Sequence, residues 1–304
     1  MQNISRLIIA GMAINVYAQL EPPKYDWNVT LKVVDETGRP VEGVKTKVFY
    51  LLTNEIAGLT DTNGIFKASH LDGSENLGFL ADKKGYYSFR IMYHLGRTYK
   101  PAKWNSTQTV VLKRIIKPIP MYAKSVNYGM PVFDKPVGYD LTMGDWVDPY
   151  GKGINTDMIF TAHREKRAVD DTDYKLIVSF PKQGDGIQEF DTPSYYLHDR
   201  GSELLSSEEA PTNRYQPNWI QTKTRRPGKP MESNWNEYRN YYFRVRTKVD
   251  DRGNIVSAHY GKIYGDFMNF AYYFNPTPSD RNVEFDPKQN LMTNLKTDEG
   301  VSAH

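Results

Sequence analysis

Three carboxylates close together in the sequence have the residue types that hydrolysis requires. Asp185, Glu189 and Asp191 lie in one short segment. Glycoside hydrolysis uses two acids at a set separation, one to donate a proton and one to act as base or nucleophile. Acids are common in β-rich chains, so this spacing alone does not separate a catalytic pair from solvated carboxylates. A carbohydrate-active hydrolase therefore stays open as an alternative function, and we assign no catalytic residue.

Metal and thiol chemistry find little support in the sequence. The six histidines are scattered without an H-x-x-x-H pair, and the chain has no cysteine, which excludes disulfides and thiolate ligands. The run Asp170–Asp173 offers hard oxygen ligands for Ca²⁺ but lacks the glycine and distal glutamate of a calcium loop. A solvated turn explains this run, so we expect no metal and no cofactor.

The strongest basic cluster runs from Thr222 to Pro230. Such a cluster could meet anionic glycans or lipid headgroups. Proline and glycine interrupt it, which favours a solvated loop. Over the whole chain, 39 Lys and Arg against 36 Asp and Glu leave a net charge of +3. That balance lacks the basic footprint of nucleic-acid binders, so we expect no nucleic-acid partner.

Aromatic residues are the main signal for binding. The chain holds 22 Tyr, 13 Phe and 5 Trp, and many of them alternate with Asn, Gln, Arg and Glu in the second part of the chain. Flat rings beside hydrogen-bonding groups suit sugar faces, although Tyr and Phe also form strands and fill cores. We predict Trp219 and Trp235 as stacking platforms for a glycan. Their predicted neighbours in this site are Tyr215, Tyr238, Asn218, Asn234 and Asn236.

The region that must position these residues, 121–304, is predicted to be β-rich. Its clearest element is a long hairpin, in which Tyr241–Val249 and Ile255–Tyr264 flank a loop containing Gly253. The other expected strands are Val137–Thr142, Met158–Ala162, Tyr174–Phe180 and Met268–Phe274. The polar tail after Asp286-Pro287 is expected to fray.

The first third of the chain shows short alternating strands separated by turns. The runs V-V-D-E-T-G-R-P-V-E-G-V (33–44), T-D-T-N-G-I-F (60–66) and K-K-G-Y-Y (83–87) resemble the carboxypeptidase regulatory-like family. The resemblance covers residues 26–114 and implies a transthyretin-like antiparallel β-sandwich without catalytic residues. The Asn63-Gly64 turn is expected to close a tight hairpin. Two prolines in residues 115–120 predict a linker to the second domain.

The N-terminus has the layout of a secretory signal peptide. Arg6 precedes the apolar run Leu7–Ile14, and small residues stand at the −3 and −1 positions of a cleavage site after Ala18. We therefore expect a Sec-type signal peptide at 1–18 and a lead segment at 19–25. Gln19 stands where a lipoprotein would have cysteine. No later run is long enough to span a membrane.

Together these features predict an exported, all-β, two-domain bacterial protein, periplasmic or secreted. We expect a non-catalytic accessory module that binds or supports other components of the envelope, with a polysaccharide or an envelope protein as partner. Two alternatives remain open: the hydrolase described above, and an assembly protein that pairs its exposed strand edges with another chain. The sequence leaves the oligomeric state open.

Overall fold

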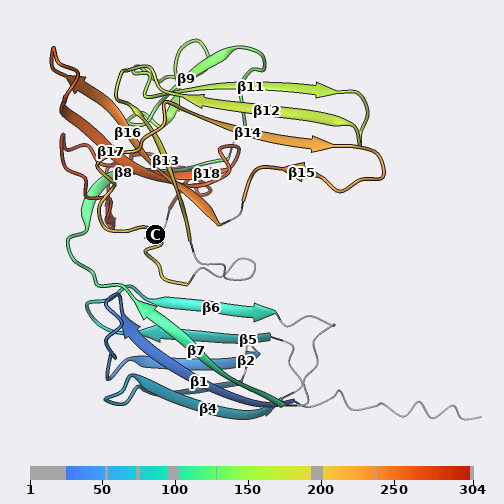
Figure 1. Ribbon diagram of the computed structural model, residues 1–304, viewed down its shortest axis with the longest axis vertical. Helices are drawn as coiled ribbons and strands as arrows, with labels where there is room; N and C mark the ends of the chain where they lie inside the picture. The colour runs from blue at the N-terminus through green and yellow to red at the C-terminus, as the bar shows by residue number, and fades with distance from the viewer. Residues whose placement is uncertain are drawn as a thin grey trace, which may run out of the picture.

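The computed structural model describes residues 25–51, 54–72, 76–94, 103–127, 129–192, 201–236 and 238–301. Within these ranges the regular elements are the strands β1 to β19, and no helix occurs (Figure 1). The predicted all-β class is thus confirmed. The predicted signal peptide and residues 19–24 of the lead segment lie outside the described ranges. In the part of the chain that is described, no helix is long and apolar enough to cross a membrane.

Two sheets built from the first part of the chain share one hydrophobic core. One sheet has the order β4-β1-β7 and the other β3-β2-β5-β6 (Figure 1). Alternation explains the packing, because Trp27, Val29, Leu31 and Val33 of β1 all point into this core. The strands are β1 (Tyr25–Asp35), β2 (Lys45–Leu51), β3 (Asn54–Leu59), β4 (Ile65–Asp72), β5 (Asn76–Asp82), β6 (Phe89–His94) and β7 (Lys103–Leu112).

The turn at residues 60–64 does not close the hairpin that its sequence predicted. It joins β3 to β4, which belong to different sheets. The Asp61 carboxylate accepts hydrogen bonds from the backbone N–H groups of Asn63 and Ile65 at 2.9 and 2.8 Å. Gly64 then approaches β1 so closely that a Cβ would lie 2.3 Å from the Val33 carbonyl oxygen. This contact directs β4 onto β1, so the turn is a crossover between sheets.

The rest of the chain forms two six-stranded sheets, ordered β10-β9-β11-β12-β14-β15 and β13-β16-β17-β18-β8-β19. Aromatic and aliphatic side chains from both sheets form a common core, in which Tyr139, Phe160, Phe243 and Tyr272 are fully buried. The strands are β8 (Ile119–Val126), β9 (Pro136–Asp140), β10 (Asp145–Trp146), β11 (Met158–Lys166), β12 (Thr172–Ser179), β13 (Gly186–Asp191), β14 (Asn218–Arg225), β15 (Glu232–Ser233), β16 (Arg239–Val249), β17 (Ile255–Gly265), β18 (Phe270–Phe274) and β19 (Phe285–Asn290).

The long predicted hairpin is confirmed as β16 and β17, which pair antiparallel. A bulge interrupts the pairing between Val245 and Lys248, and Arg246 within it has a positive φ of 54°. The bulge turns the Arg246 guanidinium toward Asp157, whose two oxygens accept its Nε and Nη2 at 2.7 and 2.8 Å. This bidentate ion pair fixes the loop before β11 against the opposite sheet.

A buried carboxylate joins the two pairs of sheets. Glu284 accepts hydrogen bonds from the Tyr87 hydroxyl and the Ile116 N–H, both at 2.9 Å, and from the Lys117 N–H at 2.5 Å. Of the predicted linker 115–120, the last two residues belong to β8, because Ile119 pairs with Phe285 of β19. The connection is thus held by hydrogen bonds as well as by its prolines.

Candidate functional site

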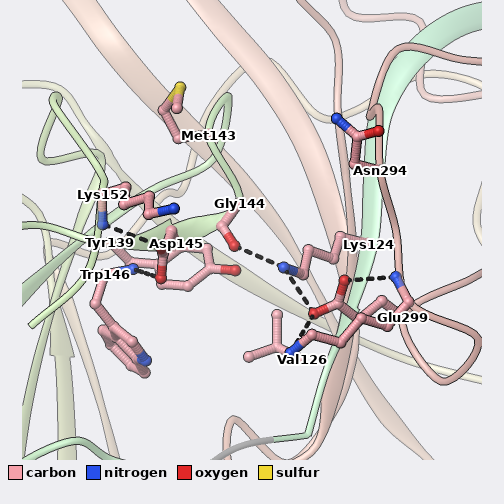
Figure 2. A pocket seen from close by; sticks show the side chains of 11 residues that line it. Lys124, Val126, Tyr139, Met143, Gly144, Asp145, Trp146, Lys152, Asn294 and Glu299 are labelled. Carbon is pink, nitrogen blue, oxygen red and sulfur yellow. Dashed lines mark hydrogen bonds and ion pairs between the residues drawn. The ribbon is translucent and has the colours of Figure 1, made fainter.

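A pocket of about 470 Å³ opens where β8, the β9–β10 turn and the C-terminal segment meet (Figure 2). Its volume lies within the range of small-molecule binding sites. Basic, acidic, amide and aromatic side chains share the lining. The lining residues are Lys124, Val126, Tyr139, Met143, Gly144, Asp145, Trp146, Lys152, Asn294, Lys296 and Glu299.

Asp140, beneath the pocket, holds the turn that forms one wall. One carboxylate oxygen accepts the N–H groups of Thr142 and Met143 at 2.9 and 3.0 Å, and the other accepts those of Ile154 and Asn155 at 3.0 and 2.8 Å. Burial alone would raise the pKa of Asp140, but the four backbone donors bring it below its usual value. Asp140 therefore stays ionised and structural.

Gly144 allows the turn to approach β8. Its φ is +64°, and a Cβ there would lie 2.8 Å from Met292 Cε and 2.9 Å from Lys124 Cδ. The Gly144 carbonyl oxygen accepts a hydrogen bond from Lys124 Nζ at 2.9 Å. A side chain at this position would crowd those two side chains and would be strained at this positive φ.

An ion pair forms the floor on the opposite side. Lys124 Nζ lies 3.1 Å from Glu299 Oε1, and both side chains are largely buried. The Glu299 backbone carbonyl accepts the Ser125 N–H at 2.9 Å, which attaches the C-terminal segment to β8. The predicted fraying of the tail is therefore wrong for residues up to 301, because backbone pairing and a buried ion pair hold this polar segment.

The open side of the pocket presents alternating donors and acceptors. Asp145 faces the pocket while its oxygens accept the N–H groups of Trp146 and Lys152 at 2.8 and 2.9 Å. The Lys152 side chain is exposed at the rim, and the Tyr139 hydroxyl points toward the Lys124–Glu299 pair (Figure 2). Backbone hydrogen bonds fix the Asp145 carboxylate, and the exposed Lys152 ammonium lies at the rim beside it, so the two can bind a polar ligand that carries several hydroxyl or amide groups.

Trp219, a predicted stacking platform, lies in the core. It is only 9% exposed and packs against Tyr241 and Phe267, with ring centroids 5.1 Å away in each case. Its indole N–H donates to Glu189 Oε1 at 2.5 Å. The prediction overlooked that alternation places Trp219 on the inner face of β14, where it presents no face to a sugar.

Trp235 is 37% exposed, and Lys223 Nζ lies 5.8 Å from its ring centroid. The neighbouring asparagines have structural contacts. Asn234 Oδ1 accepts the Thr222 N–H and its amide donates to the Ile220 carbonyl, both at 2.8 Å, and Asn236 Oδ1 accepts the Tyr238 N–H at 3.0 Å. These bonds shape the segment that carries Trp235.

The remaining predicted site residues have separate surroundings. Asn218 is exposed at the start of β14, and Tyr238 is half-buried. Tyr215 packs beside Tyr260 and beneath the Arg244 guanidinium, which lies 4.6 Å from the ring centroid. The predicted residues therefore do not share one lining, and none of them lines the pocket at β8.

The three acids of the hydrolase alternative are also held by other groups. Asp185 is buried and accepts the Thr247 N–H at 2.8 Å, and burial raises its pKa. Glu189 and Asp191 share one face of β13, where Arg239 lies 3.2 Å from an oxygen of each. Arg239 thus bridges the two carboxylates.

The Asp170–Asp173 run, predicted as a solvated turn, forms ion pairs with two arginine side chains of the same chain. Asp173 accepts hydrogen bonds from Arg167 at 2.5 Å and from Arg226 at 2.8 and 2.9 Å. Arg167 first and Arg226 second lower the pKa of Asp173 to about 2. Among the described residues, no group of three or more His, Cys, Asp or Glu side chains is placed to hold a metal ion.

Sequence reasoning missed the pocket because its residues come from three distant segments. Lys124 lies at the start of the region 121–304, outside the strands predicted there, and Glu299 lies in the tail that was expected to fray. The D-L-T-M-G-D run at 140–145 was the available signal, since an aspartate followed four residues later by a glycine is typical of a tight turn.

Comparisons with known proteins leave the family open. No family model matches the chain, and no curated protein matches it. A solved structure from Bacteroides fragilis, described as a membrane-associated protein of unknown function, aligns with 84% of this chain and 99% of its own, at 10% identity and a TM-score of 0.22. So low a score carries no argument about fold or function.

Proposed function

We propose that the protein is an exported, non-catalytic binding module of the bacterial envelope, and that the pocket at β8 takes a saccharide. The observation that carries this proposal is a space of about 470 Å³ lined by charged donors and acceptors, of which Lys124, Asp145 and Glu299 are held by hydrogen bonds or an ion pair. Lys124, Asp145, Lys152 and Glu299 supply charged hydrogen-bonding groups, which complement a ligand rich in hydroxyl groups. The proposal retains the predicted class of ligand and moves its site from the aromatics to this pocket.

The contacts of the acids favour binding over catalysis. A glycosidase needs one carboxyl group with a raised pKa to protonate the leaving oxygen. Glu299 is paired with Lys124, and Asp145 accepts two backbone hydrogen bonds. Asp185 has a raised pKa but is buried beside Thr247 and is not part of the pocket lining.

A glycan and polysaccharide array tests this function, with product analysis on the same samples. We expect retention of the protein without new reducing ends. New reducing ends that disappear in Asp185→Asn or Glu189→Gln would establish the hydrolase instead. Absence of retention, together with co-purifying chains, would favour the assembly alternative.

A further inference from the structure

A second hollow lies on the same pair of six-stranded sheets, at the end of β11, β12 and β14 remote from the pocket lining. These strands extend past the opposite sheet in Figure 1. Beyond that sheet their inward-facing positions are only partly covered, and they form a groove of about 380 Å³. The groove is lined by Arg164, Lys166, Val169, Thr172, Tyr174, Lys223, Thr224, Arg225, Met231 and Met268.

The register of the strands explains why cations gather there. Tyr174 of β12 pairs with Arg164 on one side and Lys223 on the other. Two residues further along, Thr172 pairs with Lys166 and Arg225. Side chains two residues apart on a strand share a face. The row through Tyr174 and the row through Thr172 therefore both continue the inward face of the sheet, which carries Phe160 in the core.

The two faces of this extension differ in the balance of their charges. On the outer face, Asp173 and Asp171 are bound by Arg167 and Arg226. The groove lining has four basic side chains and no acidic one, and one of the four, Lys223, meets the Asp266 carboxylate at 2.7 Å. The groove is therefore complementary to an anion, although this pair of sheets carries both charges elsewhere on its surface.

Apolar side chains stand beside these cations at the tip of the sheet. Val169, in the loop between β11 and β12, is 80% exposed, and Met231, in the loop between β14 and β15, is 63% exposed. Both loops lie at the same end, because Thr172 at the start of β12 pairs with Arg225 at the end of β14. Exposed apolar residues rimmed by basic ones are typical of surfaces that enter a lipid interface.

The groove also offers a neutral donor. The Tyr174 hydroxyl is buried and makes no hydrogen bond to another described residue. Burial, followed by the nearby charge of Asp266, raises the pKa of Tyr174 to about 12, so the hydroxyl keeps its proton at neutral pH. A phosphate oxygen is an acceptor that this hydroxyl and the surrounding guanidinium groups can bind together.

We propose that this groove and the apolar tip beside it dock the protein on a lipid bilayer containing acidic phospholipids. The cations meet the headgroup phosphates, and Val169 and Met231 enter the interface. An acidic peptide would use the cations but leave these two side chains in water, so the bilayer accounts for more of the surface. This site is independent of the saccharide pocket.

Co-sedimentation of the full chain with vesicles tests the docking surface. The vesicles contain either phosphatidylglycerol mixed with phosphatidylcholine or phosphatidylcholine alone. We expect binding to the acidic vesicles, and a fall of roughly tenfold or more in the double variant Lys166→Glu/Arg225→Glu, since each basic residue near such a surface contributes measurably. Val169→Ser/Met231→Ser tests the apolar part and should also weaken binding.

The matched control is Lys175→Glu/Lys288→Glu, which makes the same charge change at exposed positions outside the groove lining. Circular dichroism checks that all variants fold. Equal losses in both charge variants, equal binding to neutral vesicles, or unchanged binding in the groove variant would overturn the proposal. So would retention on an immobilised acidic peptide without any binding to vesicles, which would assign a protein partner.

Discussion

At the scale of single residues, His259 on β17 makes stability depend on pH. Burial first, and then the Arg246 guanidinium, lower the pKa of His259. Below about pH 6.5 the unfolded chain takes up a proton that the folded chain resists. The free energy of unfolding should therefore fall as the pH drops from 6.5 toward the folded pKa, by up to about 1.4 kcal/mol per pH unit. Urea unfolding at pH 7.5 and 5.5 measures this, and His259→Asn should flatten the difference.

The control is His163→Asn, because His163 on β11 is about half exposed and its 2.8 Å contact with the exposed Asp134 is a surface pair of little energy. It should keep the wild-type dependence on pH. Carboxylates with a lowered pKa, such as Asp140, lose their contribution to stability only at lower pH values. They therefore do not add to the change measured between pH 7.5 and 5.5. An unchanged slope in His259→Asn would contradict the assignment.

At the scale of elements, Gly261 lets β17 pack between its neighbours. A Cβ at this position would lie 2.2 Å from Phe243 Cζ and 2.3 Å from the Tyr273 carbonyl oxygen. The carbonyl belongs to the backbone of β18 and has little room to move. We expect Gly261→Ala to lower the free energy of unfolding by about 2–3 kcal/mol, measured from the urea midpoint.

Gly300→Ala is the comparison for Gly261→Ala. The nearest atom to its added Cβ, the Thr297 carbonyl oxygen, would be 3.9 Å away, so the midpoint should move little. If both variants unfold at the wild-type midpoint, the close packing described around Gly261 is incorrect.

The sequence predicted the strands that alternate over a long run, such as β16 and β17. It missed β8, because the prolines at 118 and 120 indicate a linker and its partners β18 and β19 lie more than a hundred residues away. It missed β14 because basic residues occupy its uncovered end. The candidate site was beyond sequence reasoning for the same reason, since Lys124 meets Glu299 only through the pairing of distant segments.

At the scale of the whole molecule, Glu284 holds the connection between the two pairs of sheets. Removing its carboxylate leaves the Tyr87 hydroxyl and the N–H groups of Ile116 and Lys117 without their acceptor. Buried donors without acceptors are costly, so Glu284→Ala should destabilise the protein by about 3 kcal/mol or more. Limited proteolysis should then cut between residues 113 and 118.

Asp251→Ala provides the control, since Asp251 is an exposed acid in the β16–β17 turn. It should leave both stability and proteolysis unchanged. Wild-type resistance of Glu284→Ala to protease, with an unchanged urea midpoint, would show that the connection does not depend on this carboxylate.

The most direct test of the binding site compares three chains on the same glycan array: wild type, Lys152→Met and Trp235→Ala. Lys152 is exposed at the pocket rim, so its replacement should spare the fold. A saccharide bound in the pocket predicts that wild type and Trp235→Ala are retained by the same glycans, while Lys152→Met loses roughly tenfold or more in affinity, as expected for a charged hydrogen bond. Equal retention of Lys152→Met, or retention of no chain at all, would contradict binding in this pocket.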